Sequence, residues 1–123
     1  MQVRIQKIAL LLIVVVIAAW PLPQRRLSQI ELWNQPFHPF RLIGNVYFVG
    51  VSGISSFLIV TPDGSFLLDG ALKESAGYIA QSVAELGFAL TDVKYLLNSH
   101  PHFDHAGGLA ELKRLSGALL VAS

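Results

Sequence analysis

The chain has 123 residues, of which 53% are hydrophobic, and its formal net charge at pH 7 is +1. This length allows one small domain with a hydrophobic core, and the composition excludes an intrinsically disordered chain. The near-neutral charge, with no basic cluster beyond Arg25 and Arg26, excludes nucleic acid as an expected partner, and the absence of cysteine excludes disulfides, thiolate metal ligands and a lipid-modified N-terminal cysteine.

Residues 1–23 have the layout of a signal peptide. Arg4 and Lys7 precede an unbroken apolar run over residues 8–20, whose end contains two consecutive alanines. The run is shorter than the roughly 20 apolar residues that a transmembrane helix needs. We therefore expect a periplasmic or secreted protein with no stable membrane association after cleavage, and an uncleaved membrane anchor is the alternative.

Residues 24–44 predict an irregular arm, because prolines interrupt the segment and its aromatic side chains are expected to pack over a core. The pattern then changes to short strands at 46–51, 56–61 and 66–69. The Pro-Asp-Gly-Ser sequence at 62–65 predicts a turn, since proline presets one dihedral angle and glycine accepts a positive φ. Together these segments predict a meander of antiparallel strands.

The second half of the chain predicts alternating helices and strands. A helix is expected over 75–86, where apolar or small residues recur at helical spacing and Gly87 follows as a stop. The short apolar run within 92–98 predicts a strand, a second helix is expected over 108–115, and another strand over 118–122. This order of elements is typical of an α/β protein.

Three histidines and an aspartate follow the strand at 92–98 within six residues: His100, His102, Asp104 and His105. Imidazole and carboxylate are the groups that bind zinc when thiolates are absent. In an extended segment, side chains two positions apart point the same way, so His100 and His102 are expected to converge on one ion while Asp104 and His105 turn toward a second. The two glycines at 107–108 are expected to let the backbone turn into the next helix.

The alternative interpretation is that these are solvated loop histidines with a helix-capping aspartate. That interpretation suits any one of them alone. Four such residues at this spacing arise by chance in only about one in ten thousand chains of this size. The cluster therefore predicts metal binding.

The segment 100–105 resembles the metal-binding loop of the metallo-β-lactamase superfamily. The resemblance covers residues 33–123 and extends through four further motifs, which are Gly44-Asn45-Val46-Tyr47-Phe48-Val49-Gly50, Gly53-Ile54-Ser55-Ser56, Leu67-Leu68-Asp69-Gly70-Ala71 and His105-Ala106-Gly107-Gly108-Leu109. Together they are similar to the third subclass of class B enzymes, whose zinc ligands include no cysteine. The resemblance implies an α/β fold, in which residues 45–123 form the N-terminal half of an αββα sandwich with a mostly antiparallel sheet and flanking helices.

The resemblance also implies a function, a zinc-dependent hydrolase of β-lactam antibiotics with up to two Zn²⁺ ions. His100 and His102 would bind the first ion, and Asp104 and His105 the second. Asp104 would also be catalytic, because it would anchor the second zinc and orient the attacking water. The implied partner is a small-molecule substrate, with a β-lactam as the expected class.

Two other residues are given roles by this comparison. Asp69 matches an aspartate that steadies the metal loop, although a simple turn aspartate before Gly70 fits the sequence equally well. His38 matches no ligand position, and we expect it to be a surface or packing residue.

The third protein ligand of each zinc is missing, because no histidine follows His105. We therefore expect this chain to be the N-terminal part of a longer enzyme, with weak metal affinity and little activity by itself. The missing second sheet would leave one sheet face uncovered. The alternatives are a lactonase or thioesterase of the same superfamily, or a non-catalytic zinc-binding fragment; the export signal and the motif at 53–56 favour the lactamase.

Overall fold

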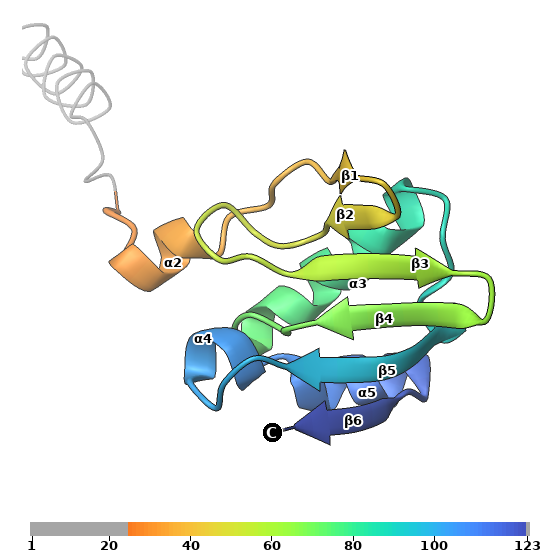
Figure 1. Ribbon diagram of the computed structural model, residues 1–123. Coiled ribbons are helices and arrows are strands. Elements are labelled where there is room, and N and C mark those ends of the chain that lie inside the picture. Colours follow the sequence, from red (N-terminus) through yellow and green to blue (C-terminus); the bar gives the residue numbers. More distant parts are fainter. Residues whose placement is uncertain (1–24, 123) are drawn as a thin grey trace, which may run out of the picture.

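The computed structural model describes residues 25–122 of the chain (Figure 1). The predicted signal peptide at 1–23 lies outside the described residues. Among the helices of the described part, none reaches the length and apolarity that a membrane crossing requires.

Six strands form a single mixed sheet in the order of the sequence. Their bounds are Phe40–Ile43 (β1), Val46–Phe48 (β2), Phe57–Thr61 (β3), Gly64–Leu68 (β4), Val93–Asn98 (β5) and Leu119–Ala122 (β6). The first four pair antiparallel, which confirms the predicted meander, and β5 and β6 add in parallel to β4. Parallel neighbours need crossover connections, and the helices after β4 and β5 provide them.

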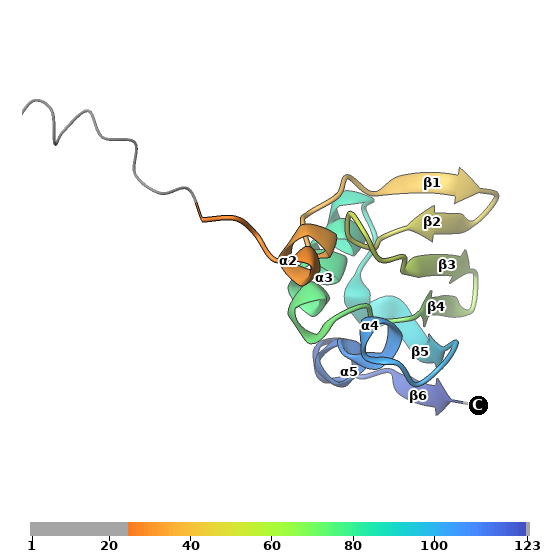
Figure 2. The ribbon, with the colours of Figure 1, turned by 90° about the vertical axis from the view of Figure 1, so that its left-hand side faces the viewer.

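The helical elements are α2 (Gln29–Trp33), η1 (Lys73–Ser75), α3 (Ala76–Glu85), η2 (Leu90–Asp92), α4 (Phe103–Ala106) and α5 (Leu109–Ser116). The two predicted helices correspond to α3 and α5, which lie on the same side of the sheet (Figures 1 and 2). Both end as the sequence indicates, because Gly87 and Gly117 follow them with φ of 84° and 75°. The predicted α/β layering is confirmed.

The predicted irregular arm at 24–44 is partly regular, because it contains α2 and β1. Ser28 caps α2 through a reciprocal pair of bonds: its hydroxyl accepts from the backbone N–H of Glu31, and the Glu31 carboxylate accepts from the backbone N–H of Ser28. Strand β1 forms because Phe40 pairs with Phe48 across the sheet and stacks on it at 5.3 Å between ring centroids. Helix α2 therefore follows from a local capping signal, whereas β1 depends on a contact that exists only in the folded sheet.

The hydrophobic core lies between α3, α5 and one face of the sheet. Leu58, Leu67 and Leu96 are neighbours in the register of β3, β4 and β5, and all three are fully buried. Ile79 of α3 and Leu112 of α5 belong to the same buried cluster. This layer fixes the end of β5, from which the histidine loop begins.

Replacing Leu96 by alanine is expected to lower the free energy of unfolding by about 2–5 kcal/mol, because the cavity left in this layer cannot be filled from solvent. Leu119→Ala is the matched control, since Leu119 is 63% exposed and its truncation should change stability by about 0.5 kcal/mol or less. Urea denaturation measures both values. Equal losses for the two variants would contradict the position of the core.

The other face of the sheet carries two rows of apolar side chains that follow the strand register. One row is Phe40, Phe48, Phe57, Leu68, Leu97 and Val121, and the other is Val46, Ile59, Phe66, Tyr95 and Leu119. Several members are exposed, including Tyr95 at 38% and Val121 at 48%. No position in either row is charged, which is unusual for a face left in water. The expected uncovered sheet face is thus present in the described part of the chain.

Candidate metal centre

The histidine loop begins where β5 ends at Asn98 and runs into α4. The backbone is extended at His102, with φ −76° and ψ 151°, and becomes helical from Phe103. The N–H groups of His105 and Ala106 donate to the carbonyl of His102 at 3.0 and 2.8 Å. The extended loop assumed from the sequence therefore does not continue beyond His102, and Asp104 and His105 project from a helical turn.

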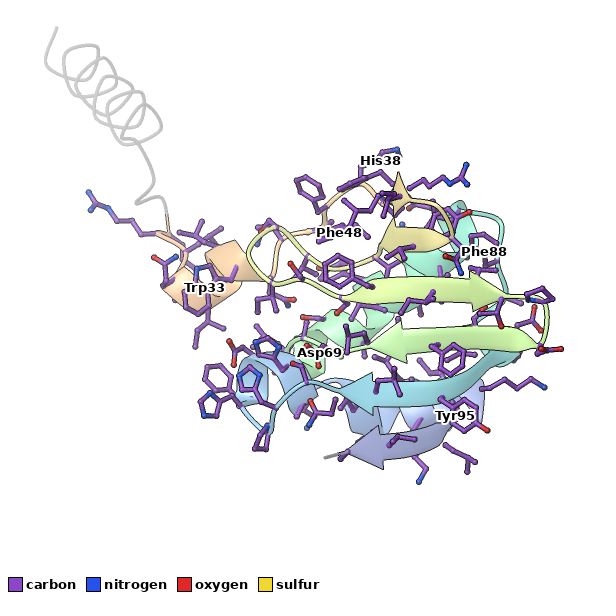
Figure 3. All side chains as sticks on the ribbon, in the orientation of Figure 1. Trp33, His38, Phe48, Asp69, Phe88 and Tyr95 are labelled. Atoms are coloured by element: carbon purple, nitrogen blue, oxygen red, sulfur yellow. The ribbon has the colours of Figure 1, made fainter. Side chains whose placement is uncertain are left out.

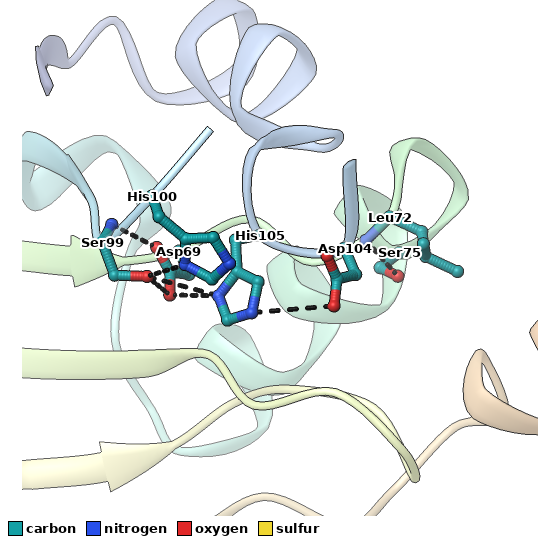
Figure 4. A network of polar contacts seen from close by, with 7 residues as sticks. All are labelled: Asp69, Leu72, Ser75, Ser99, His100, Asp104 and His105. Carbon is teal, nitrogen blue, oxygen red and sulfur yellow. Dashed lines mark hydrogen bonds and ion pairs between the residues drawn. The ribbon is translucent and has the colours of Figure 1, made fainter. Parts of the chain in front are cut away.

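Three of the four predicted ligands come together in the structure. One ligand atom from each of His100, Asp104 and His105 lies within 4.8 Å of the others. The His105 Nε2 atom is 3.7 Å from Asp104 Oδ2, and the His100 and His105 ring centroids are 3.9 Å apart (Figure 4). His102 is outside this group, although its ring centroid lies 4.7 Å from that of His100. The division of the four ligands into two pairs stays a prediction.

Asp69 supports this cluster from the end of β4. Its Oδ1 accepts the backbone N–H of Ser99 at 2.7 Å, and its Oδ2 accepts the Ser99 hydroxyl at 2.6 Å and Nδ1 of His105 at 2.7 Å (Figure 4). The predicted role of Asp69 in steadying the metal loop is confirmed. A simple turn aspartate would not bind both the first residue of the loop and a ligand within it.

The charge of Asp69 is stabilised where it lies. Burial alone would raise the pKa of Asp69, but the hydrogen bonds from His105 and Ser99, together with the attraction of His105, outweigh it and lower the pKa below its ordinary value. The carboxylate is therefore ionised at neutral pH and can accept a hydrogen bond from His105 Nδ1. A neutral His105 that donates from Nδ1 has an unprotonated Nε2, the ring nitrogen nearer Asp104, and that nitrogen can bind a metal.

The turn that carries Asp69 has an uncommon backbone. Asp69 and Ala71 have φ of 62° and 51°, values that cost about 1–3 kcal/mol in a residue other than glycine. Two bonds hold the turn in place, from Asp69 N to the Leu97 carbonyl at 2.8 Å and from Gly70 N to the His105 carbonyl at 2.7 Å. The metal loop and the turn thus stabilise each other's conformation.

Gly107 and Gly108 serve a different purpose from the one predicted. Their φ values, −58° and −84°, are open to any residue, so they are not needed for a turn. A Cβ on Gly108 would lie 2.2 Å from the Gly70 carbonyl oxygen, and one on Gly107 would lie 2.8 Å from the Lys73 nitrogen. The two glycines are required because the backbone after the metal loop presses against the backbone after Asp69.

Gly108→Ala is therefore expected to lower the free energy of unfolding by about 1–3 kcal/mol, because its methyl group would overlap backbone atoms that cannot move aside. Gly77→Ala, within α3, is the matched control, since nothing lies within 4 Å of its added Cβ. That variant should be neutral or more stable by up to about 1 kcal/mol. Thermal unfolding of both proteins tests the pair, and a neutral Gly108→Ala would contradict the close approach.

Two residues of the site were not identified from the sequence. Ser99 binds Asp69 through both its backbone and its hydroxyl, and the available signal was a hydroxyl residue directly before the first histidine. Trp33, which the sequence predicts only to pack, lines a cavity of about 340 Å³ together with Asp104 and His105. Nothing in the sequence indicates that contact, because Trp33 precedes Asp104 by 71 positions.

His38 and a second hollow of the surface lie away from the ligand cluster. His38 is on the surface as predicted, with a side chain 90% exposed and Nδ1 3.8 Å from Glu85, and Figure 3 shows it well away from Asp69. A larger hollow of about 390 Å³ surrounds the β3–β4 turn near Asp63 and Lys94, at the opposite end of the strands. Asp104 and His105 line the smaller cavity instead.

Comparison with known proteins gives the same assignment. Residues 49–123 match the family described as the metallo-beta-lactamase superfamily. Among solved structures, the chain is 57% identical to MEM-A1, a subclass B3 metallo-β-lactamase from a soil metagenome library, over 74% of this chain and 34% of that one, with a TM-score of 0.72.

Two further solved structures agree. The Rm3 metallo-β-lactamase is 51% identical over 78% of this chain and 36% of that one, with a TM-score of 0.75. BJP-1, a subclass B3 enzyme of Bradyrhizobium japonicum, is 45% identical over 76% of this chain and 35% of that one, with a TM-score of 0.71. The chain spans about a third of the length of these proteins. With more than half of its residues matched, the chain belongs to the metallo-β-lactamase superfamily.

Proposed function

We propose that the complete protein containing this chain is a zinc-dependent hydrolase of β-lactams. The observation that carries the proposal is the group formed by His100, Asp104 and His105, held by Asp69 beside an open cavity. The likeness to subclass B3 metallo-β-lactamases supports the substrate class.

The donor set fits zinc. Two imidazoles and a carboxylate are ligands that zinc accepts, and a catalytic zinc commonly has three protein ligands. When bound, zinc would polarise the substrate carbonyl and lower the pKa of a water molecule. The contact of Asp69 with His105 Nδ1 leaves Nε2 to bind the ion, and Asp104 places a carboxylate at the wall of the cavity. We also propose that His102 is a ligand, and that the ligands divide as the sequence predicts, with His100 and His102 on one ion and Asp104 and His105 on the other.

The uncovered sheet face supports the view that further polypeptide completes the site. Its two rows of apolar side chains would be buried by a second sheet, as the family resemblance implies. Such a sheet would bring the ligands that this chain lacks. We therefore expect the 123-residue chain alone to bind zinc weakly or substoichiometrically and to show little β-lactamase activity.

The experiment measures how fast the complete, zinc-loaded protein hydrolyses each of three substrates: nitrocefin, a homoserine lactone and a thioester. Faster turnover of the lactam is the expected result, because the proposed site serves an activated cyclic amide. Preference for the lactone or thioester would assign another hydrolase of the superfamily. The 123-residue chain is assayed in parallel, alone and mixed with a separately produced C-terminal half, and efficient hydrolysis by the chain alone would contradict the need for further ligands.

We also propose that the protein is exported. The support is the sequence of residues 1–23, with two basic residues before an apolar run. Cell fractionation with N-terminal sequencing tests the proposal: a shortened periplasmic or secreted form supports it, an uncleaved form in the membrane indicates the anchor, and a full-length cytoplasmic form contradicts both.

A further inference from the structure

The arm that precedes the sheet is fastened at two points beside the metal loop. The Ser52 hydroxyl donates to the carbonyl oxygens of Leu32 and Trp33 at 2.7 and 3.1 Å, and the backbone N–H of Gly53 donates to the Trp33 carbonyl at 2.9 Å. Gly53 also lies against the indole, since a Cβ there would be 2.7 Å from Trp33 Cδ1. The first fastening therefore fixes both the backbone and the ring of Trp33.

The second fastening is a bond between Ser75 and Asn34, the residue after α2. The Ser75 side chain is fully buried, its hydroxyl donates to Asn34 Oδ1 at 2.6 Å, and it accepts the backbone N–H of Leu72 at 3.1 Å. Leu72 belongs to the turn after Asp69, against which the metal loop packs (Figure 4). The buried Ser75 hydroxyl thus links the arm to the turn after Asp69, which supports the ligand cluster.

These contacts place an aromatic wall next to the ligands. The cavity of about 340 Å³ is lined by Trp33, Gly53, Ile54, Ser55, Asp104 and His105. Figure 3 shows Trp33 at the same end of the sheet as Asp69. Trp33 as a whole is 37% exposed, so it still has surface to offer a ligand. The volume is within the range of small-molecule sites, and its apolar wall suits an aromatic group.

We propose that Ser75 and Asn34 are positioning residues that hold Trp33 as the binding wall for an aromatic substituent of the substrate. The inference rests on the proposed hydrolase function for its substrate. The indole would contact the substituent equally in the ground state and in the transition state, so it lowers KM and leaves kcat unchanged. Loss of the Ser75–Asn34 bond would let the arm shift and weaken the same contact without removing a ligand of the metal.

The first test uses the complete zinc-loaded protein with benzylpenicillin, which carries a phenyl group, and 6-aminopenicillanic acid, which lacks it. Trp33→Ala is expected to raise KM for benzylpenicillin about three- to tenfold, and Asn34→Ala about two- to fivefold. KM for 6-aminopenicillanic acid should rise less than KM for benzylpenicillin, the change should fall on KM rather than on kcat, and zinc content should stay at its wild-type value. Asn34→Asp keeps the acceptor and Trp33→Phe keeps an aromatic face, so both should restore most of the affinity.

Phe37→Ala is the matched control, because Phe37 is a half-exposed aromatic residue of the arm that packs on Phe48 instead. Equal shifts for the two substrates, or a KM for benzylpenicillin that Asn34→Ala leaves unchanged, would overturn the inference. If the wild-type protein hydrolyses neither compound while binding zinc, the proposed function fails, and the position of Trp33 is then decided by fluorescence.

The fluorescence test needs no turnover. In the 123-residue chain with Trp20→Phe, Trp33 is the single tryptophan. Saturating Co²⁺ should quench its emission, because the indole is held beside Asp104 and His105, and the quenching should weaken in Asn34→Ala and Ser75→Ala. Undiminished quenching in both variants, or none in the parent, would show that these residues do not position the ring.

Discussion

Replacing Asp104 by alanine is expected to lower kcat/KM for a β-lactam in the complete protein by at least about a hundredfold. Asp104 is the one carboxylate in the ligand group and also lines the cavity. Its removal would leave two imidazoles there and take away the charge that faces His105 Nε2 at 3.7 Å. Steady-state hydrolysis of nitrocefin, with zinc content determined on the same sample, measures the effect.

Asp63→Ala is the matched control for this prediction. Asp63 lies in the β3–β4 turn, at the opposite end of the strands from the metal loop. Its variant should keep wild-type turnover and zinc content. Near-wild-type turnover by Asp104→Ala, in a protein that unfolds at the normal temperature, would remove Asp104 from the catalytic machinery.

Asp69→Asn is expected to weaken zinc affinity about 10–100-fold, the usual effect of losing a carboxylate that supports a metal-binding histidine. In the variant, an amide oxygen or an NH₂ group would replace the carboxylate oxygen that accepts hydrogen bonds from Ser99 and His105. An NH₂ group there would favour the His105 tautomer with its hydrogen on Nε2, where the metal should bind. Competition with a chromophoric chelator measures the affinity.

The same substitution in an exposed turn, Asp63→Asn, controls for the change of charge. Circular dichroism and thermal unfolding show whether Asp69→Asn keeps its fold, because the Asp69 turn also supports the loop backbone. A folded Asp69→Asn protein with wild-type zinc affinity would show that the aspartate acts on structure alone.

The metal centre illustrates what residue spacing can and cannot predict. His100, Asp104 and His105 were predicted as ligands because four ligand-type residues in six positions are improbable by chance. The assumption of an extended loop was wrong beyond His102, since the turn of α4 begins at Phe103. A helical turn of four residues carries little periodic signal, and this one is stabilised by contacts of Gly107 and Gly108 with a distant part of the chain.

Local signals were enough for most of the secondary structure. The turn before Gly64, the stops at Gly87 and Gly117 and the apolar spacing of α3 each depend on residues close together in sequence. Strand β1 was missed because it has no alternating pattern of its own and is ordered by pairing with β2. Helix α2 was missed although Ser28 and Glu31 form a local capping pattern, because the prolines that follow favour an irregular segment.

The sequence by itself determined the α/β order of elements, the family resemblance and the ligand types, because these depend on residue identity and short-range spacing. Tertiary structure alone decided that Asp69 binds Ser99 and His105, that Ser75 binds Asn34, and that Trp33 shares a cavity with the ligands. Each of these contacts joins residues at least 30 positions apart. Which of many polar or aromatic side chains meet over such distances is decided by the packing of the sheet and its helices, and no local pattern encodes it.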